Sequence, residues 1–250
     1  LASIMQHLDP HSVYISLEEF QAANDQIMGS FEGIGVQFRI EKDTVLVVQT
    51  IANGPSEKIG IRAGDRIVEV DGENIAGKGI DNNKVMKLLK GKKGTKVVLG
   101  IKRAEMQGLI NFTVTRDVIP TYSIDYYGMI NSDIGYIKLS SFNIESDREF
   151  VNALNKLISQ GMKGLIFDLR GNGGGALNAS IRILDQMFEE NILLVYTQGL
   201  HREKRDYLST RRGSFKKGKV VVLIDEFSAS ASEIVAGAVQ DNDRGTVIGR

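Results

Sequence analysis

The 250-residue sequence has no cysteine, no tryptophan, three prolines, three histidines and no excess of either charge, with 31 basic and 31 acidic residues. Without cysteine there can be no disulfide, thiolate catalysis or Cys-type zinc site. A formal net charge of zero argues against a polyanion such as nucleic acid as partner. His7, His11 and His201 lack metal-ligand spacing and are interpreted as exposed residues, so we expect neither a metal nor another cofactor.

The composition is otherwise that of a globular protein, because 42% of the residues are hydrophobic and 25% are charged. No apolar run approaches the length that spans a membrane, and no signal peptide is visible. The sequence starts at Leu1 without a methionine and ends just after a strand-like run at 246–248, so we expect both ends to continue in a longer protein. The missing targeting segment is therefore no argument for a cytosolic location.

Short strands punctuated by glycine predict a small β-rich domain over residues 29–116. It follows a segment over 1–28 that is expected to be helical with a break at Asp9-Pro10. Within the small domain, Asp71-Gly72 is a turn signal. The expected strands are 35–40, 44–48, 66–72 and 96–101, and a helix is expected over 83–89.

Strands that alternate with helices predict an α/β domain over residues 117–250. Its first part, 117–131, contains Pro120 and three tyrosines and is interpreted as a connection. The expected strands are 134–139, 165–169, 193–196 and 220–224, and the expected helices are 147–159, 177–188 and 233–239. The predicted fold class is therefore a multidomain α+β or α/β chain.

The run Gly33-Ile34-Gly35-Val36 opens the first strand of the small domain. A Gly-x-Gly turn at a strand edge can leave successive N–H groups free to capture the terminal carboxylate of a peptide that adds to the sheet. A plain β-turn that needs a positive φ at glycine explains the same residues. Spacing alone favours the plain turn.

Further runs at 54–58, 60–67 and 70–72 accompany this turn, and Ala63-Gly64-Asp65-Arg66-Ile67 is the most distinctive of them. Together they resemble a bacterial PDZ domain. The resemblance implies that the domain grips C-terminal peptides through the Gly33–Val36 loop and the adjoining helix. It would place Val85, Met86 and Leu89 in the side-chain pocket, although the same three residues also fit a hydrophobic core.

A cluster of serines, Ser228, Ser230 and Ser232, lies between the apolar strand at 220–224 and the last expected helix. At such a junction a nucleophilic hydroxyl can sit beside a helix N-terminus, whose free N–H groups stabilise an oxyanion. The alternative is structural, because Ser230 and Glu233 have the spacing of a capping box in which Ser230 is the N-cap.

The glycine turn Gly171-Asn172-Gly173-Gly174-Gly175 follows the strand at 165–169. With Ala176 it matches the dinucleotide-binding fingerprint, but that fold needs an acidic residue after the next strand. The next strand here ends in Tyr196-Thr197-Gln198, which contains no acid. The glycines are better explained as bringing backbone N–H groups close to a substrate carbonyl.

Taken with the PDZ-like domain, the serine run and the glycine turn resemble the C-terminal processing (tail-specific) serine peptidases, whose PDZ domain is inserted. The resemblance extends from about Leu8 to the last residue and implies a crotonase/Clp-protease-like α/β core. It makes Ser230 the nucleophile and assigns the oxyanion hole to the N–H groups of Ala231 and Gly174. It also implies a lysine general base, kept neutral by burial, that lies beyond Arg250.

Three further residues are assigned supporting roles. Asp241 matches an acidic residue of the family motif, but a straight helix would place it roughly 16 Å from Ser230, so a structural role is expected. Asp168 and Arg170 are expected to form an ion pair that holds the glycine turn.

The resulting hypothesis is a serine endopeptidase that binds protein tails through its PDZ domain and cleaves them with a Ser-Lys dyad. The resemblance implies a periplasmic or other extracytoplasmic location. The competing hypothesis is a non-catalytic tail-binding adaptor with an inert core. The sequence leaves the substrate and a homo-oligomeric state open.

Overall fold

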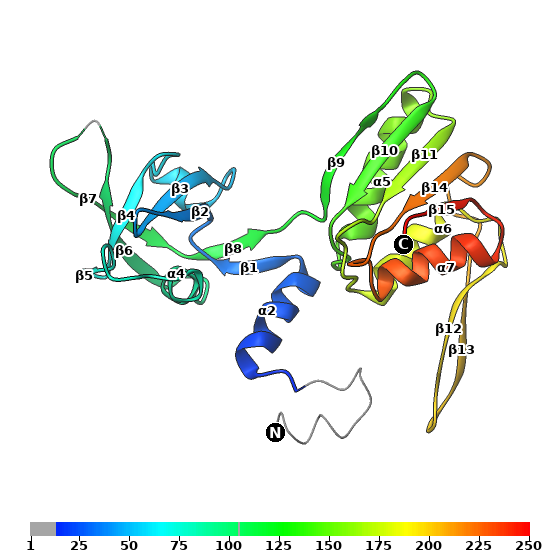
Figure 1. Cartoon of the computed structure of the whole chain (residues 1–250), viewed down its shortest axis with the longest axis horizontal. Coiled ribbons are helices and arrows are strands. Elements are labelled where there is room, and N and C mark those ends of the chain that lie inside the picture. The colour runs from blue at the N-terminus through cyan, green and yellow to red at the C-terminus, as the bar shows by residue number, and fades with distance from the viewer. Residues whose placement is uncertain (1–13, 105) are drawn as a thin grey trace. The chain divides into compact units, whose positions relative to one another are not determined.

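The computed structural model describes residues 14–104 and 106–250, so Asp9-Pro10, His7 and His11 lie outside the described residues. The chain divides into a small unit, Ser30–Thr121, and a core unit, which combines the segment ending at Gly29 with Tyr122–Arg250. Strand β1 (Ser30–Gly33) pairs with β8 (Asp117–Pro120) so that Ser30 lies opposite Pro120. The chain therefore enters and leaves the small unit at neighbouring points (Figure 1).

The small unit is built on one antiparallel sheet in the order β2-β3-β4-β6-β7. Its strands are β2 (Val36–Glu41), β3 (Thr44–Thr50), β4 (Arg66–Val70), β6 (Lys96–Lys102) and β7 (Ile110–Thr115), with the short β5 (Glu73–Asn74) beside β4. Two helices, α3 (Pro55–Lys58) and α4 (Asn82–Leu89), accompany the sheet. Alternate residues such as Val45 and Val47 point into the core because successive strand side chains face opposite sides. Strand β2 lies at the edge of the sheet, which leaves one of its sides unpaired within the unit.

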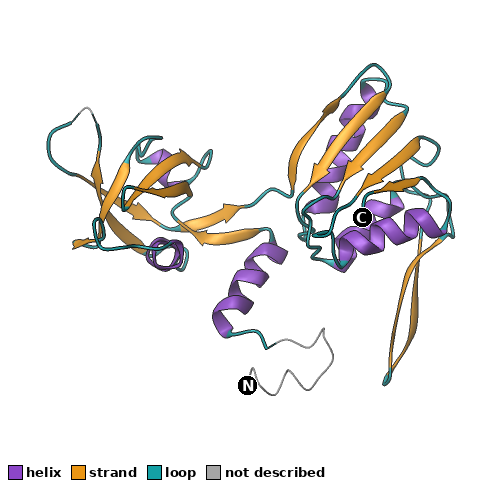
Figure 2. Ribbon diagram, in the orientation of Figure 1, coloured by secondary structure: helices purple, strands orange, loops and turns teal. Residues whose placement is uncertain are grey.

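The core unit contains a five-stranded sheet in the order β15-β14-β11-β10-β9. Its strands are β9 (Ile124–Met129), β10 (Ile134–Leu139), β11 (Gly164–Asp168), β14 (Lys219–Leu223) and β15 (Thr246–Ile248), and only β9 is antiparallel to its neighbour. Helices α5 (Ser146–Ser159), α6 (Leu177–Asp185) and α7 (Ala231–Asp241) pack against it, and α2 (Leu17–Met28) precedes the small unit (Figure 2). The predicted fold class, a small β-rich domain plus an α/β core, is confirmed.

The sheet topology places two loops at the same edge. Strands β11 and β14 are parallel neighbours, with Asp168 opposite Leu223 at their carboxyl ends. The glycine turn follows β11, and the serine run follows β14. The crevice outside the carboxyl ends of parallel strands is where ligands bind in open α/β sheets. Two segments separated by about 60 residues in the sequence therefore meet at one site because of strand order.

Two sequence predictions were wrong in detail, and one strand was not predicted. Residues 117–131 are not a plain connection, because β8 pairs with β1 and the tyrosine-rich β9 extends the main sheet. Pro120 is tolerated because it is the last residue of an edge strand. Helix α6 ends at Asp185, one turn before the predicted end. The segment after Gly199 was not predicted as a strand, yet β13 (Arg202–Leu208) pairs with β12 (Leu193–Gly199) in a separate two-stranded ribbon.

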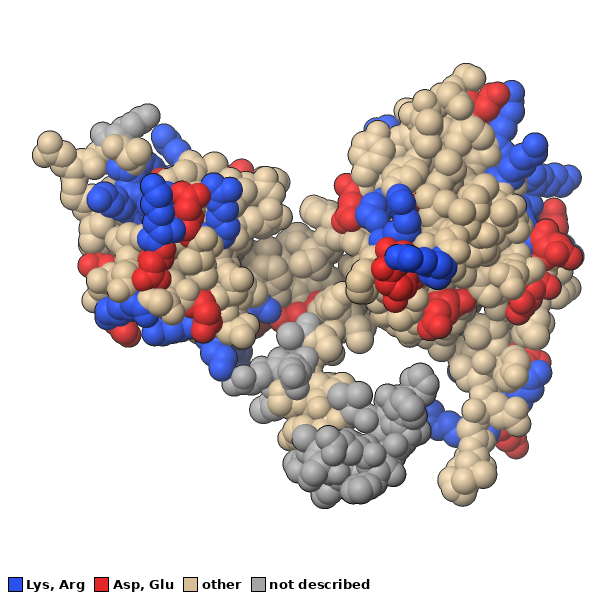
Figure 3. Space-filling model, in the orientation of Figure 1, with Lys and Arg blue, Asp and Glu red and all other residues tan. Residues whose placement is uncertain are grey.

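On the face drawn in Figure 3, basic and acidic side chains are interspersed on each unit. No helix within the described ranges is both long and apolar enough to cross a lipid bilayer.

Candidate active site

Ser230 lies between β14 and α7, has φ +53° and ψ −110°, and is exposed. An ordinary N-cap residue has an extended backbone, whereas a non-glycine residue in this region carries about 1–3 kcal/mol of strain. The capping box expected from the sequence is present, and Glu233 Oε2 accepts a hydrogen bond from Ser230 N at 2.6 Å. Capping alone does not require the strain. A strained strand-to-helix turn that exposes a serine hydroxyl is the arrangement of a nucleophile elbow.

Gly174 lies directly against this serine. A Cβ atom at Gly174 would lie 2.7 Å from Ala229 O, 2.8 Å from Ser230 Cβ and 2.9 Å from Ala231 N, and the residue has φ +98°. Only glycine fits such a position without displacement of its neighbours. The structure thus brings together Ser230, Gly174 and Ala231, the three residues to which the resemblance assigns nucleophile and oxyanion hole.

The two expected oxyanion donors differ in their present partners. Ala231 is the first residue of α7, and the N–H groups of the first helical turn have no acceptor within the helix. Gly174 N instead donates to Asn172 Oδ1 at 2.8 Å. A substrate oxyanion at this position would compete with a neutral amide oxygen, and a charged acceptor forms the stronger hydrogen bond.

Two further residues at the site, Asn172 and Ser232, were given no role of their own from the sequence. Asn172 is fully buried, and its backbone oxygen accepts from Ala229 N at 3.1 Å and from Ser232 Oγ at 2.8 Å. Its side-chain Nδ2 donates to Leu139 O at 2.9 Å. Ser232 is also fully buried. A polar residue among glycines is the only sequence signal for Asn172, because its distant partners come from two separate segments, Leu139 and the serine run.

The glycine turn does not belong to a dinucleotide-binding unit. Such a unit needs a strand, a helix and a second parallel strand in one sheet. After β11 and α6 the chain enters β12, which pairs with β13 and not with the main sheet. Two glycines of the turn, Gly174 and Gly175, serve close contacts instead: at Gly175, with φ +138°, a Cβ would lie 2.0 Å from Phe142 O.

Asp168 and Arg170 form the expected ion pair, with 2.6 Å between Arg170 Nη2 and Asp168 Oδ2. The Asp168 carboxylate is fully buried and also accepts from Tyr136 Oη at 2.6 Å. Burial raises the pKa of Asp168, but the hydrogen bonds from Arg170 and Tyr136 outweigh burial and lower this pKa to about 2. The pair therefore fixes the end of β11, immediately before the glycine turn.

This depressed pKa predicts a loss of stability in acid. A carboxylate whose pKa falls from 3.8 to about 2 on folding contributes on the order of 2 kcal/mol above pH about 4. That contribution disappears as the pH falls from about 4 through about 2, where the folded protein also binds the proton. We expect Asp168→Asn to be less stable than wild type near pH 6 but nearly equal to it near pH 2 in urea unfolding.

The matched control is Asp206→Asn, which neutralises an exposed carboxylate on β13. The free energy of unfolding of Asp206→Asn should differ little from that of wild type over the whole acid range. A difference between wild type and Asp168→Asn that stays constant over the acid range would contradict the assignment.

Asp241 is the last residue of α7, at the opposite end of the helix from Ser230, and it is exposed. The rise of 1.5 Å per residue separates their backbones by roughly 16 Å along the axis. The structure therefore does not bring Asp241 to the serine. His201 lies in the exposed turn between β12 and β13.

In the small unit, the Gly33–Val36 loop connects β1 to the edge strand β2, and Gly35 has φ +73°. Ile34 is buried, and its carbonyl accepts from Ser56 N at 3.1 Å and Ser56 Oγ at 2.7 Å. The end of α4 lies beside the loop, because Gly91 N donates to Glu32 O at 3.2 Å.

The three helix residues assigned to the peptide pocket have different environments. Val85 is fully buried and Leu89 is 4% exposed, so both pack into the hydrophobic core. Met86 is 36% exposed and is the member of the three that opens to solvent.

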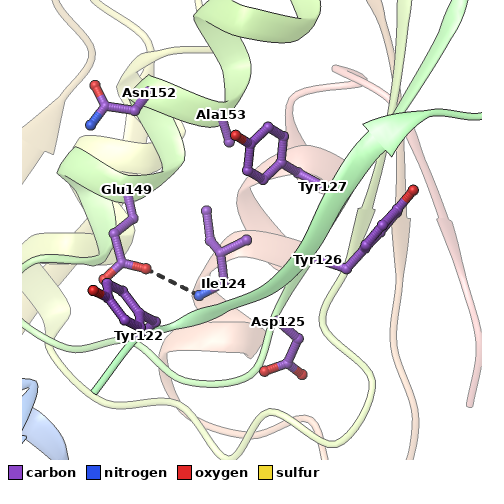
Figure 4. Close-up of a pocket in the computed structure, with 8 residues that line it drawn as sticks. All are labelled: Tyr122, Ile124, Asp125, Tyr126, Tyr127, Glu149, Asn152 and Ala153. Atoms are coloured by element: carbon purple, nitrogen blue, oxygen red, sulfur yellow. Dashed lines mark hydrogen bonds between the residues drawn. The ribbon is translucent and has the colours of Figure 1, made fainter. Parts of the chain in front are cut away.

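A hollow of about 410 Å³ lies elsewhere in the core unit, between β9 and α5 (Figure 4). Tyr122, Ile124 and Tyr127 line it together with Glu149, whose carboxylate accepts from Ile124 N at 3.2 Å. None of the residues that line this hollow belongs to the glycine turn or the serine run.

Comparison with known proteins identifies both parts of the chain. Residues 133–250 match the model of peptidase family S41, and residues 33–115 match that of the PDZ domain. Carboxy-terminal processing protease CtpA of Bacillus subtilis is 34% identical over 241 residues, which cover 96% of this chain and 51% of that protein. The carboxy-terminal-processing protease of Bartonella bacilliformis is 33% identical over 247 residues, covering 97% and 56%.

Among solved structures, the photosystem II D1 C-terminal processing protease has a TM-score of 0.49 and 26% identity, covering 96% of this chain and 65% of that one. The chain spans about half the length of the curated relatives it matches. The resemblance predicted from the sequence is confirmed. Residues 133–250 are thus identified as a peptidase S41 domain, and residues 33–115 as a PDZ domain.

Proposed function

We propose that this protein is a serine endopeptidase that recognises substrates by their C-terminal tails. The observation that carries the proposal is the strained, exposed Ser230, held against Gly174 and beside the first N–H of α7. The match of residues 133–250 to peptidase family S41 and the names of the relatives support the same chemistry.

In the proposed reaction, Ser230 Oγ attacks the peptide carbonyl while its proton passes to a neutral lysine, the base that the resemblance places beyond Arg250. The N–H groups of Ala231 and Gly174 stabilise the oxyanion. The C–N bond then breaks, the amine takes the proton, and water hydrolyses the resulting ester. Burial would keep such a lysine neutral by disfavouring its ammonium form.

Tail recognition is assigned to the PDZ domain. A peptide can add as a strand along the free side of β2, with its carboxylate at the Gly33–Val36 loop. The neighbouring Met86 supplies an exposed apolar contact at α4. We further propose an extracytoplasmic location, which the resemblance supports and which fractionation of cells tests directly.

The decisive experiment presents the intact protein with a folded substrate that carries an unstructured C-terminal tail. Cleavage is expected for the free-acid tail and is expected to be much slower when the tail carboxylate is amidated. A protein that binds the tail and never cleaves it would be the competing tail-binding adaptor.

Met86 allows the tail site to be tested without catalysis. Met86→Glu places a negative charge near the expected peptide carboxylate and removes an apolar contact, so we expect tail affinity to fall about tenfold, or about 1.4 kcal/mol. Fluorescence anisotropy with a labelled tail peptide measures the change. Met106→Glu is the control, because Met106 is 51% exposed in the loop between β6 and β7. Equal affinities of the two variants would show that Met86 is not part of the tail-binding site.

A further inference from the structure

The serines on either side of Ser230 are both tied to the segment that leads into and through the glycine turn. Ser228 Oγ donates to Leu169 O at 2.9 Å, and Ser232 Oγ donates to Asn172 O at 2.8 Å. Ser230 lies between these two anchors and is exposed. The alternation of serine with alanine thus separates two serines with anchoring hydroxyls from Ser230, which is exposed.

Asp225 completes the anchor upstream of Ser230. Its Oδ1 accepts from Gly171 N at 2.9 Å, which joins the serine loop to the glycine turn. The same oxygen accepts from Phe227 N at 3.1 Å and lies 3.3 Å from Ser228 Oγ. Asp225 N in turn donates to Ser228 Oγ at 3.0 Å. One carboxylate thus fixes the start of both loops.

The charge state of Asp225 suits this role. The hydrogen bond from Gly171 N, aided by the one from Phe227 N, holds the pKa of Asp225 below its ordinary value. Lys138 is the nearby cation that contributes to the same lowering. The side chain is therefore a carboxylate at neutral pH, with acceptors for several donors at once.

The backbone of Ser230 explains why two anchors are needed. A residue in a strained conformation persists only when the surrounding structure over-determines it. Here Ser232, which is bonded to the buried Asn172, holds the chain after Ser230. Asp225, together with Ser228, holds the chain before it. Loss of either anchor lets Ser230 relax, and a displacement of the order of 1 Å can lower a catalytic rate about 100-fold.

We propose that Asp225 and Ser228 are positioning residues for the reaction at Ser230: they hold the serine loop on the glycine turn and thereby keep the hydroxyl and the oxyanion donors in register. The proposal rests on the proposed peptidase function. Neither residue touches the reacting atoms, so each acts through the geometry of Ser230.

The test compares Asp225→Ala, Asp225→Asn and Ser228→Ala in the intact protein. Asp225→Ala is expected to lower kcat about 10- to 100-fold with KM within about twofold of wild type. Asp225→Asn keeps an oxygen acceptor at the same place and should recover most of the rate. Asp225 and Ser228 share one network, so the double Ala variant should lose less than the product of the single effects.

Glu226→Ala is the matched control, because Glu226 lies in the same loop next to Asp225, is exposed, and has a carboxylate that pairs with Arg250. It should leave kcat and KM unchanged. An unchanged kcat in Asp225→Ala, or an Asn variant as slow as the Ala variant, would overturn the positioning role. Thermal unfolding within a few degrees of wild type would exclude global unfolding as the cause.

Hydrogen exchange keeps the test independent of activity. Asp225→Ala should increase amide exchange in both 169–176 and 225–234, whereas Glu226→Ala should change neither. If wild type cleaves nothing, the proposed function fails, but this measurement still decides whether Asp225 joins the two loops. Increased exchange confined to 225–234 would overturn that link.

Discussion

Ser230→Ala is expected to abolish peptide cleavage while tail binding stays at the wild-type level. The variant removes the attacking oxygen, and loss of a serine nucleophile that acts with a base lowers kcat by about 10⁴- to 10⁶-fold. The PDZ domain lies in the other unit, so its affinity for a free tail should not change. Single-turnover kinetics measure the cleavage rate, and fluorescence anisotropy with a labelled tail peptide measures tail affinity on the same preparations.

Ser132→Ala serves as its control, because Ser132 is an exposed serine in the turn between β9 and β10. Its activity should equal that of wild type. Ser230→Gly adds a stability readout, because it removes the same hydroxyl but tolerates φ +53°. Its free energy of unfolding should be about 1 kcal/mol higher than that of Ser230→Ala. Cleavage by Ser230→Ala at the wild-type rate would exclude Ser230 from the mechanism.

Gly174→Ala is the second substitution with a large expected effect. The added methyl would meet Ala229 O, Ser230 Cβ and Ala231 N at less than 3 Å, in a backbone with φ +98°. Either the turn or the serine loop must move, and the expected oxyanion donors then separate. We expect kcat to fall about 10²- to 10³-fold, the range for loss of one oxyanion donor, and stability to fall by about 1–3 kcal/mol.

The neighbouring glycine provides an internal comparison. A Cβ at Gly173 would meet no atom within 4 Å, and Gly173 has no positive φ. Gly173→Ala should therefore keep nearly full activity and stability, as measured by the same cleavage assay and urea unfolding. If the two Ala variants behaved alike, the close approach at Gly174 would not be what the active site requires.

Local patterns were sufficient to predict most of the framework. The apolar runs of β11 and β14 and the one-sided apolar face of α5 predicted buried elements. Asp71-Gly72 predicted a tight turn, and both residues have positive φ. These features depend on neighbours in the sequence, which is why they can be recognised there. The tyrosine-rich β9 was missed although its partner, β10, follows directly in the sequence, because an edge strand with no buried residue lacks the apolar pattern of a core strand.

The candidate site shows the same division. A serine cluster beside a helix start and a glycine turn after a strand are visible in the sequence. The backbone angles of Ser230 and the burial of Asn172 and Ser232 are not, because they depend on how β11 and β14 pair. The link from Asp225 to Gly171 spans 54 residues and has no local pattern. Positions and residue types could be predicted, whereas the contacts that tie them together could not.

The pairing of β1 with β8 has an evolutionary consequence. Because the PDZ-bearing unit is joined to the rest of the chain by two strands that run side by side, it resembles a cassette with a single attachment point. A recombination event that exchanged everything between Gly29 and Tyr122 would carry both strands of this ladder with it, so the small unit would keep its own closing pair of strands. If the protein binds tails as proposed, tail preference could therefore diverge among relatives whose core unit stays the same.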